Sequence, residues 1–274
     1  MLQFLVCSDI HSYAENIRLA IQKTDQVDAI LIAGDLEVEE DKVRDIVGSI
    51  PCYMVCGNND YYLNTDYPQE LLIDVCENTG DAPVSSDASN SSNSSISSNS
   101  SISSISSNSS NASNESNGLS IGNVTALTYD TVPDTDSVQA FSRAGFLSSI
   151  LSRLFPPKTD ELPVGLSFPQ HTFKRPSNIR HRILMTHGKE YNVPDVSLLA
   201  RRAGIWDADL VIFGHTHQFQ DTTFHRGKIR LINPGCLVGD PKASIRTYGN
   251  YEICSYSLLR ILDNGGIEAE HLFI

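Results

Sequence analysis

The chain has 274 residues, enough for one large domain or two small ones and for a substantial buried core. Its 20 Lys and Arg against 33 Asp and Glu give a formal net charge of −13, which argues against binding nucleic acid or an anionic membrane through bulk charge. The six cysteines form no C-x-x-C pair, the first residues lack the basic start of a secretory signal, and no apolar run reaches about 18 residues, so we expect a cytoplasmic protein without disulfides or membrane spans.

The N-terminal part of the chain alternates between apolar runs and helical patterns. Apolar runs at 2–7, 29–33 and 52–56 predict three buried strands. Ser12 to Glu15 has the spacing of a capping box ahead of one helix, and apolar residues between 38 and 47 predict a second helix. Repeated units of strand, helix and strand indicate a parallel sheet covered by helices.

The middle of the chain has a different composition. Residues 85–117 include 19 Ser and 7 Asn, so this segment cannot offset its ordering entropy by burial, and we predict that it is disordered. Between 138 and 154, apolar residues approximate a helical stripe. This stripe predicts either a helix packed on its own domain or a lid or partner-binding helix.

Strand patterns resume toward the C-terminus. Apolar runs at 182–186 and 210–213 predict two more buried strands with a helix near 197–202 between them. Three further runs are separated by Gly and Asn turns and predict a β-meander in a second sheet that faces the first, at 228–232, 251–262 and 267–273.

Side chains of the Asp, His and Asn types follow five of the predicted strands. They are Asp9 and His11, Asp35, Asn58, His187, and His215 with His217. Because ligands of open α/β sheets bind at the carboxyl ends of the strands, we expect these groups to lie in one crevice. Gly34, Gly57 and Gly214 precede three of these positions and allow close approach of the backbone. Singly, each position also fits a turn or a cap, but the joint pattern favours metal binding.

The donor types indicate two divalent ions. Carboxylate, imidazole and amide donors without thiolate favour Mn²⁺, Fe²⁺, Ni²⁺ or Zn²⁺ over a structural zinc clamp. Seven side chains exceed the needs of one tetrahedral ion, whereas two ions that share a bridging carboxylate would use them well. We expect Mn²⁺ first, with Mg²⁺ also compatible.

Five motifs contain these residues in order: Asp9-x-His11, Gly34-Asp35, Gly57-Asn58-x-Asp60, Thr186-His187-Gly188 and Gly214-His215-x-His217. Together they resemble the calcineurin-like metallophosphoesterase superfamily. Asn233-Pro234-Gly235-Cys236 resembles a further signature of its small single-domain phosphodiesterase branch. The resemblance covers 1–80 and 179–274, which we assign to the metallophosphoesterase domain, and leaves 81–178 as an insertion.

The resemblance implies an α/β fold, a four-layer αββα sandwich of two mixed β-sheets flanked by helices. It also implies a division of ligands between the two ions. Asp9, His11 and His217 would hold the first ion, Asn58, His187 and His215 the second, and Asp35 would bridge both.

The predicted reaction is hydrolysis of a small phosphodiester by a hydroxide that bridges the ions. Asp35, Asn58, Asp60, His187 and His215 would form the catalytic set, all but Asp60 as metal ligands. Asp60 would either hydrogen-bond a ligand or substrate group or stabilise its turn. In the phosphomonoesterase and protein-phosphatase branches a His follows the metal-binding Asn. This chain has Asn59, whose amide cannot protonate a leaving group, which favours a diesterase.

Two alternatives remain. One is a catalytically weak scaffold or protein-interaction module on the same fold, similar to the retromer scaffold subunit, with the insertion as a recruiting arm. The other is a nuclease, which the charge of −13 disfavours, so we do not expect nucleic-acid binding. A homo-oligomer is compatible with the sequence.

Overall fold

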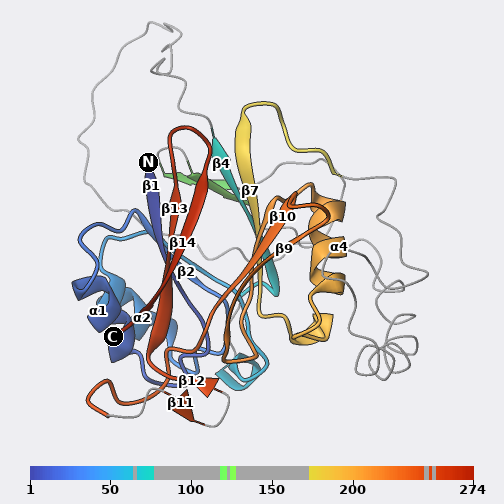
Figure 1. The fold of residues 1–274 in the computed structure, drawn as a ribbon. Coiled ribbons are helices and arrows are strands. Elements are labelled where there is room, and N and C mark those ends of the chain that lie inside the picture. Colours follow the sequence, from blue (N-terminus) through green and yellow to red (C-terminus); the bar gives the residue numbers. More distant parts are fainter. Residues whose placement is uncertain (64–66, 77–117, 122–123, 128–172, 244–246, 249–250) are drawn as a thin grey trace, which may run out of the picture. The chain divides into compact units, whose positions relative to one another are not determined.

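The computed structural model describes residues 1–63, 67–76, 118–121, 124–127, 173–243, 247–248 and 251–274 (Figure 1). Met1–Glu77 and Asn117–Ile274 form one compact unit. The predicted spacer at 85–117 and the helix expected at 138–154 lie outside the described residues, so both stay predictions.

The first sheet joins strands from both ends of the chain in the order β14-β13-β1-β2-β3. Its strands are β1 (Leu2–Cys7), β2 (Ala29–Ile32), β3 (Cys52–Met54), β13 (Ser255–Ile261) and β14 (Ile267–Phe273). The three N-terminal strands are parallel, whereas β13 runs antiparallel to both β1 and β14. Helices α1 (Glu15–Gln22) and α2 (Glu40–Val47) connect the parallel strands.

The second sheet has the order β5-β6-β4-β7-β8-β10-β9. Its strands are β4 (Glu70–Cys76), β5 (Gly118–Ile121), β6 (Val124–Leu127), β7 (Ile179–Thr186), β8 (Leu210–Ile212), β9 (Phe219–Phe224) and β10 (Ile229–Pro234). Strands β7, β8 and β10 are parallel, and the other pairs are antiparallel. Part of the segment expected to be an insertion, β5 and β6, therefore contributes to this sheet.

Three hydrophobic clusters separate four layers. Side chains such as Leu5 pack with α1 and α2 on the outer face of the first sheet. The next residue, Val6, points to the opposite face and packs with Ile183 of the second sheet, as the period of two in a strand requires. Helix α4 (Ser197–Trp206) covers the outer face of the second sheet, where Leu199 packs with Leu184 (Figure 1). The predicted αββα sandwich of two mixed sheets is confirmed.

Two local expectations are wrong. The sequence pattern places the runs at 251–262 and 267–273 in the second sheet, but strands β13 and β14 instead extend the first, with Leu2 opposite Ile261. The otherwise open edge of β1 needs hydrogen-bond partners, and a local pattern does not specify which distant strand supplies them. The capping box is also absent, because α1 begins at Glu15 without a side-chain cap and the Ser12 hydroxyl donates to the carbonyl of Glu37 instead.

Three shorter hydrogen-bonded elements lie outside the two large sheets. They are the 3₁₀ turns η1 (Asp60–Leu63) and η2 (Lys189–Tyr191), and the small hairpin of β11 (Thr247–Tyr248) and β12 (Tyr251–Glu252). All six cysteines are free thiols. None of the helices in the described ranges has the length and apolar character needed to cross a lipid bilayer.

Candidate metal centre

The seven predicted ligands lie in loops that follow β1, β2, β3, β7 and β8. Backbone hydrogen bonds join these loops side by side. The amide of His11 donates to the carbonyl of Asp35 at 3.0 Å, and the amide of Gly214 donates to that of His187 at 3.0 Å. The amide of His215 donates to Oδ2 of Asp9 at 3.0 Å, which links the second sheet to the first. The carboxyl ends of parallel strands from both sheets therefore meet at one site.

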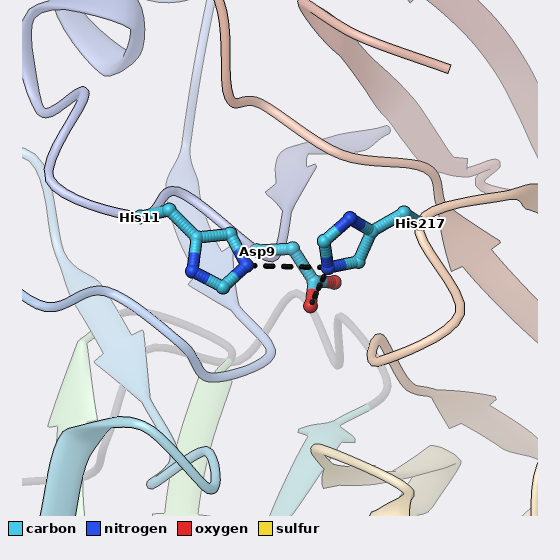
Figure 2. A group of neighbouring side chains, drawn as sticks. All are labelled: Asp9, His11 and His217. Carbon is cyan, nitrogen blue, oxygen red and sulfur yellow. Dashed lines mark hydrogen bonds and ion pairs between the residues drawn. The ribbon is translucent and has the colours of Figure 1, made fainter. Parts of the chain in front are cut away.

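Asp9, His11 and His217 form one group of converging donor atoms (Figure 2). Nε2 of His217 lies 3.2 Å from Nε2 of His11 and 3.2 Å from Oδ1 of Asp9. Two imidazole nitrogens and one carboxylate oxygen within 4.8 Å of one another are a donor set that suits a divalent ion.

Asp9, Asp35 and His187 form a second group, and all three are buried. Nε2 of His187 lies 3.3 Å from Oδ2 of Asp35. Its Nδ1 lies 2.8 Å from the carbonyl of Ala33, so Nδ1–H donates there and Nε2 faces the carboxylates. Asp9 is common to both groups, whereas the family resemblance gives the bridging position to Asp35. The division of ligands between two ions therefore stays a proposal.

His215 and Asn58 complete the predicted set beside the second group. The rings of His215 and His187 are 5.2 Å apart at an interplanar angle of 76°. Buried polar atoms nearly always have hydrogen-bond partners. Within the described part of the chain, three predicted ligand atoms are buried without one: Oδ1 of Asp9, Oδ1 of Asn58 and Nε2 of His187. Divalent cations would satisfy all three, so the residues present fit the metal ions that the motifs imply.

The backbone at these positions is unusual. Five of the seven predicted ligands have positive φ angles between 46° and 71°: Asp9, His11, Asp35, His215 and His217. Such a conformation costs a non-glycine residue roughly 1–2 kcal/mol and persists only where the surrounding structure holds it. The loops also approach very closely, because a Cβ at Gly57 would lie 2.2 Å from Oδ1 of Asp35.

The sequence profile of the calcineurin-like phosphoesterase family matches residues 2–219. The chain belongs to this family. A comparison with curated proteins gave no match. Among solved structures it is similar to a conserved uncharacterised protein of Streptococcus pneumoniae described as a predicted phosphoesterase, with 14% identity, a TM-score of 0.46, and 100% of this chain and 98% of that chain covered. It is also similar to zinc-complexed Vps29 of Entamoeba histolytica, with 16% identity, a TM-score of 0.41 and 99% of each chain covered. A structure described as a novel archaeal phosphodiesterase has 14% identity and a TM-score of 0.41, with 99% of this chain and 100% of that chain covered.

Membership in the calcineurin-like phosphoesterase family supports a metal-dependent hydrolase of phosphoric esters. The electrostatics of its site are consistent with cation binding. Burial alone would lower the pKa of His187, but the close carboxylate of Asp35, 3.3 Å from Nε2, and the charges of Asp9 and Asp35 raise it to about 9. A proton on His187 offsets part of the negative charge, and a cation bound at Nε2 must replace that proton.

The pKa values of His215 and Asp35, beside His187, are lowered rather than raised. Burial and the positive charge of His187 lower the pKa of His215. Burial would raise the pKa of Asp35, but the close imidazole of His187, its positive charge and the backbone amide of Asn59 lower it. Asp35 is therefore ionised and His215 is neutral near neutral pH, which is the state in which each can bind a metal.

Three residues outside the predicted ligand set make hydrogen bonds that hold the ligands or their loops. Asn59 donates from its backbone amide to Oδ1 of Asp35 at 2.8 Å and from its side-chain amide to Oδ2 at 2.9 Å. Asp60 accepts the amides of Glu37 at 2.9 Å and Gly57 at 2.8 Å, so its carboxylate stabilises the loops. Sequence reasoning missed the contact of Glu37 with His11, because no local signal relates positions in two different loops.

Proposed function

We propose that this calcineurin-like phosphoesterase hydrolyses small phosphodiesters with two divalent ions, Mn²⁺ first among the candidates. The observation that carries the proposal is the set of buried ligand atoms without hydrogen-bond partners in the described chain, on Asp9, Asn58 and His187. Two groups of converging donor atoms, which share Asp9, support binding of more than one ion. When bound, such ions attract a phosphate and lower the pKa of water so that hydroxide can attack phosphorus.

The residues of the site would have two roles, to bind the ions and to orient the side chains that bind them. Asp9, His11 and His217 would hold the first ion, Asn58, His187 and His215 would hold the second, and Asp35 would be available to both, as the family resemblance implies. Ala33 keeps His187 in one orientation through Nδ1, and Asn59 fixes both carboxylate oxygens of Asp35. The site is thereby organised before the ester arrives, which reduces the cost of reorganisation during reaction.

The choice of a diester over a monoester rests on Asn59. Its side-chain amide donates to Asp35 at 2.9 Å and has no acidic proton to give to a leaving group. Esters whose leaving group needs no protonation, such as aryl phosphodiesters, are the substrates that suit a site of this kind.

The test is hydrolysis of bis(p-nitrophenyl) phosphate by the Mn²⁺-reconstituted full chain, beside p-nitrophenyl phosphate as the monoester. We expect faster diester turnover, and loss of that turnover in Asp35→Ala and His215→Ala. His225→Ala, a histidine outside the motifs, serves as the matched control and should keep wild-type activity. Unchanged turnover in the two ligand variants would rule the proposal out. A scaffold would instead show little bound metal by elemental analysis and no turnover in the wild type.

A further inference from the structure

We propose that Glu37 is a positioning residue that fixes the imidazole of His11 for the first metal ion, and that Asp60 holds Glu37 in place. The inference rests on the proposed metal binding but concerns two residues outside the predicted ligand set, Glu37 and Asp60, the latter in the loop-stabilising role that was one of its two expected roles. It predicts that loss of the Glu37 carboxylate weakens the binding of one of the two ions.

The contact between Glu37 and His11 selects one ring nitrogen for the metal. Oε1 of Glu37 lies 2.8 Å from Nδ1 of His11, so the carboxylate accepts the Nδ1–H hydrogen bond. The other nitrogen, Nε2, then faces His217 at 3.2 Å. The exposed fractions are 20% for the His11 side chain and 33% for that of Glu37, so water only partly screens the pair. A carboxylate on the far nitrogen both orients a metal-binding imidazole and makes it more basic.

Glu37 is itself held from two other loops. Its amide donates to Oδ1 of Asp60 at 2.9 Å, and its carbonyl accepts from Oγ of Ser12 at 3.1 Å. Asp60 is fully buried, and its second oxygen accepts the amide of Gly57. Glu37 also has a positive φ of 52°, a conformation that these contacts must stabilise. The loops after β1, β2 and β3 therefore fix the backbone of Glu37, from which its carboxylate reaches Nδ1 of His11.

The second donor group repeats the arrangement with a different partner. His187 also has Nδ1 occupied, by the Ala33 carbonyl at 2.8 Å, and Nε2 directed at carboxylates. One imidazole in each group is thus oriented through Nδ1. An ordinary surface ion pair between Glu37 and His11 would contribute little to stability and would not require this common orientation.

The test is Mn²⁺ binding to the full chain, measured as free Mn²⁺ by electron paramagnetic resonance rather than as activity. In Glu37→Ala, we expect one of two sites to weaken about 10- to 100-fold while the other keeps its wild-type affinity. Glu37→Gln, whose amide oxygen still accepts from Nδ1–H, should recover most of the lost affinity. Glu39→Ala is the matched control in the same loop, where Glu39 makes no side-chain cap to α2, and it should bind as wild type.

A positioning residue acts only through the group it positions. In a His11→Ala background, Glu37→Ala should therefore cause no further loss of affinity. Wild-type binding in Glu37→Ala, or an equal loss at both sites, would overturn the inference and leave the proposed function standing. A wild-type chain that binds no Mn²⁺ would instead contradict the proposed function. Thermal unfolding of each variant shows whether the fold is kept. If Glu37→Ala does not fold, Glu37→Asp replaces it, because its shorter side chain draws the carboxylate away from Nδ1 of His11 and should weaken the same site.

Discussion

Substituting Gly57 by alanine tests whether the close contact between two ligand loops is needed for catalysis. The backbone of Gly57 is outside the positive-φ region, so alanine causes no conformational strain by itself. Its Cβ, however, would lie 2.2 Å from both the amide nitrogen and Oδ1 of Asp35, whereas Cβ atoms essentially never come closer than 3.0 Å. The loops that hold Asn58 and Asp35 would have to separate by about 0.8 Å, the difference between these distances.

A displacement of this size is large on the scale of catalysis. A misplacement of about 1 Å can cost on the order of 100-fold in rate. We therefore expect kcat/KM for bis(p-nitrophenyl) phosphate to fall about 100-fold in Gly57→Ala, or roughly 2.7 kcal/mol of transition-state stabilisation. Mn²⁺ affinity should fall as well, because Asp35 and Asn58 are both proposed ligands.

Gly266→Ala is the matched control. Gly266 lies in the turn between β13 and β14, and its Cβ would meet only the side chains of Asn264, at 3.1 Å, and Leu262, at 3.4 Å and beyond. Activity and metal affinity should stay at wild-type levels. If Gly57→Ala matched this control in both measurements, the loops would be able to yield without cost, and the argument from close approach would be refuted.

Two further predictions concern the stability of the second sheet. Burial would raise the pKa of Asp209, but hydrogen bonds from His181 and the Arg182 amide and the charge of Arg175 lower it below its ordinary value of 3.8. Asp209→Asn should therefore have a lower free energy of unfolding than wild type near neutral pH. Urea unfolding should show this difference shrinking below about pH 4, as Asp209 of the wild type is protonated. A difference that does not change with pH would contradict the prediction. Asp74 accepts hydrogen bonds from Nε and Nη2 of buried Arg182 at 2.6 and 2.8 Å. Asp74→Ala would leave the charge of Arg182 buried without this carboxylate, so it should lower the free energy of unfolding by about 3–5 kcal/mol. A loss under about 1 kcal/mol in urea unfolding would contradict this prediction.

Much of the site was predictable because its signal is local. Each ligand directly follows an apolar strand, and the carboxyl ends of parallel strands meet at one edge whatever the rest of the chain does. The short sequence Gly57-Asn58-Asn59-Asp60 also indicates a tight loop. The roles of Asn59 and Asp60 could not be predicted, because their side chains hydrogen-bond to Asp35 and Glu37, which lie in a different loop.

The sequence alone determined the element types and the chemistry of the donors, because strand periodicity and ligand type are properties of a few neighbouring residues. Only the tertiary structure decided that β13 pairs with β1, that Asp9 belongs to both donor groups, and that Glu37 contacts His11. Each of these facts joins segments that are distant along the chain. Such contacts depend on the packing of two whole sheets, which no short window of sequence encodes.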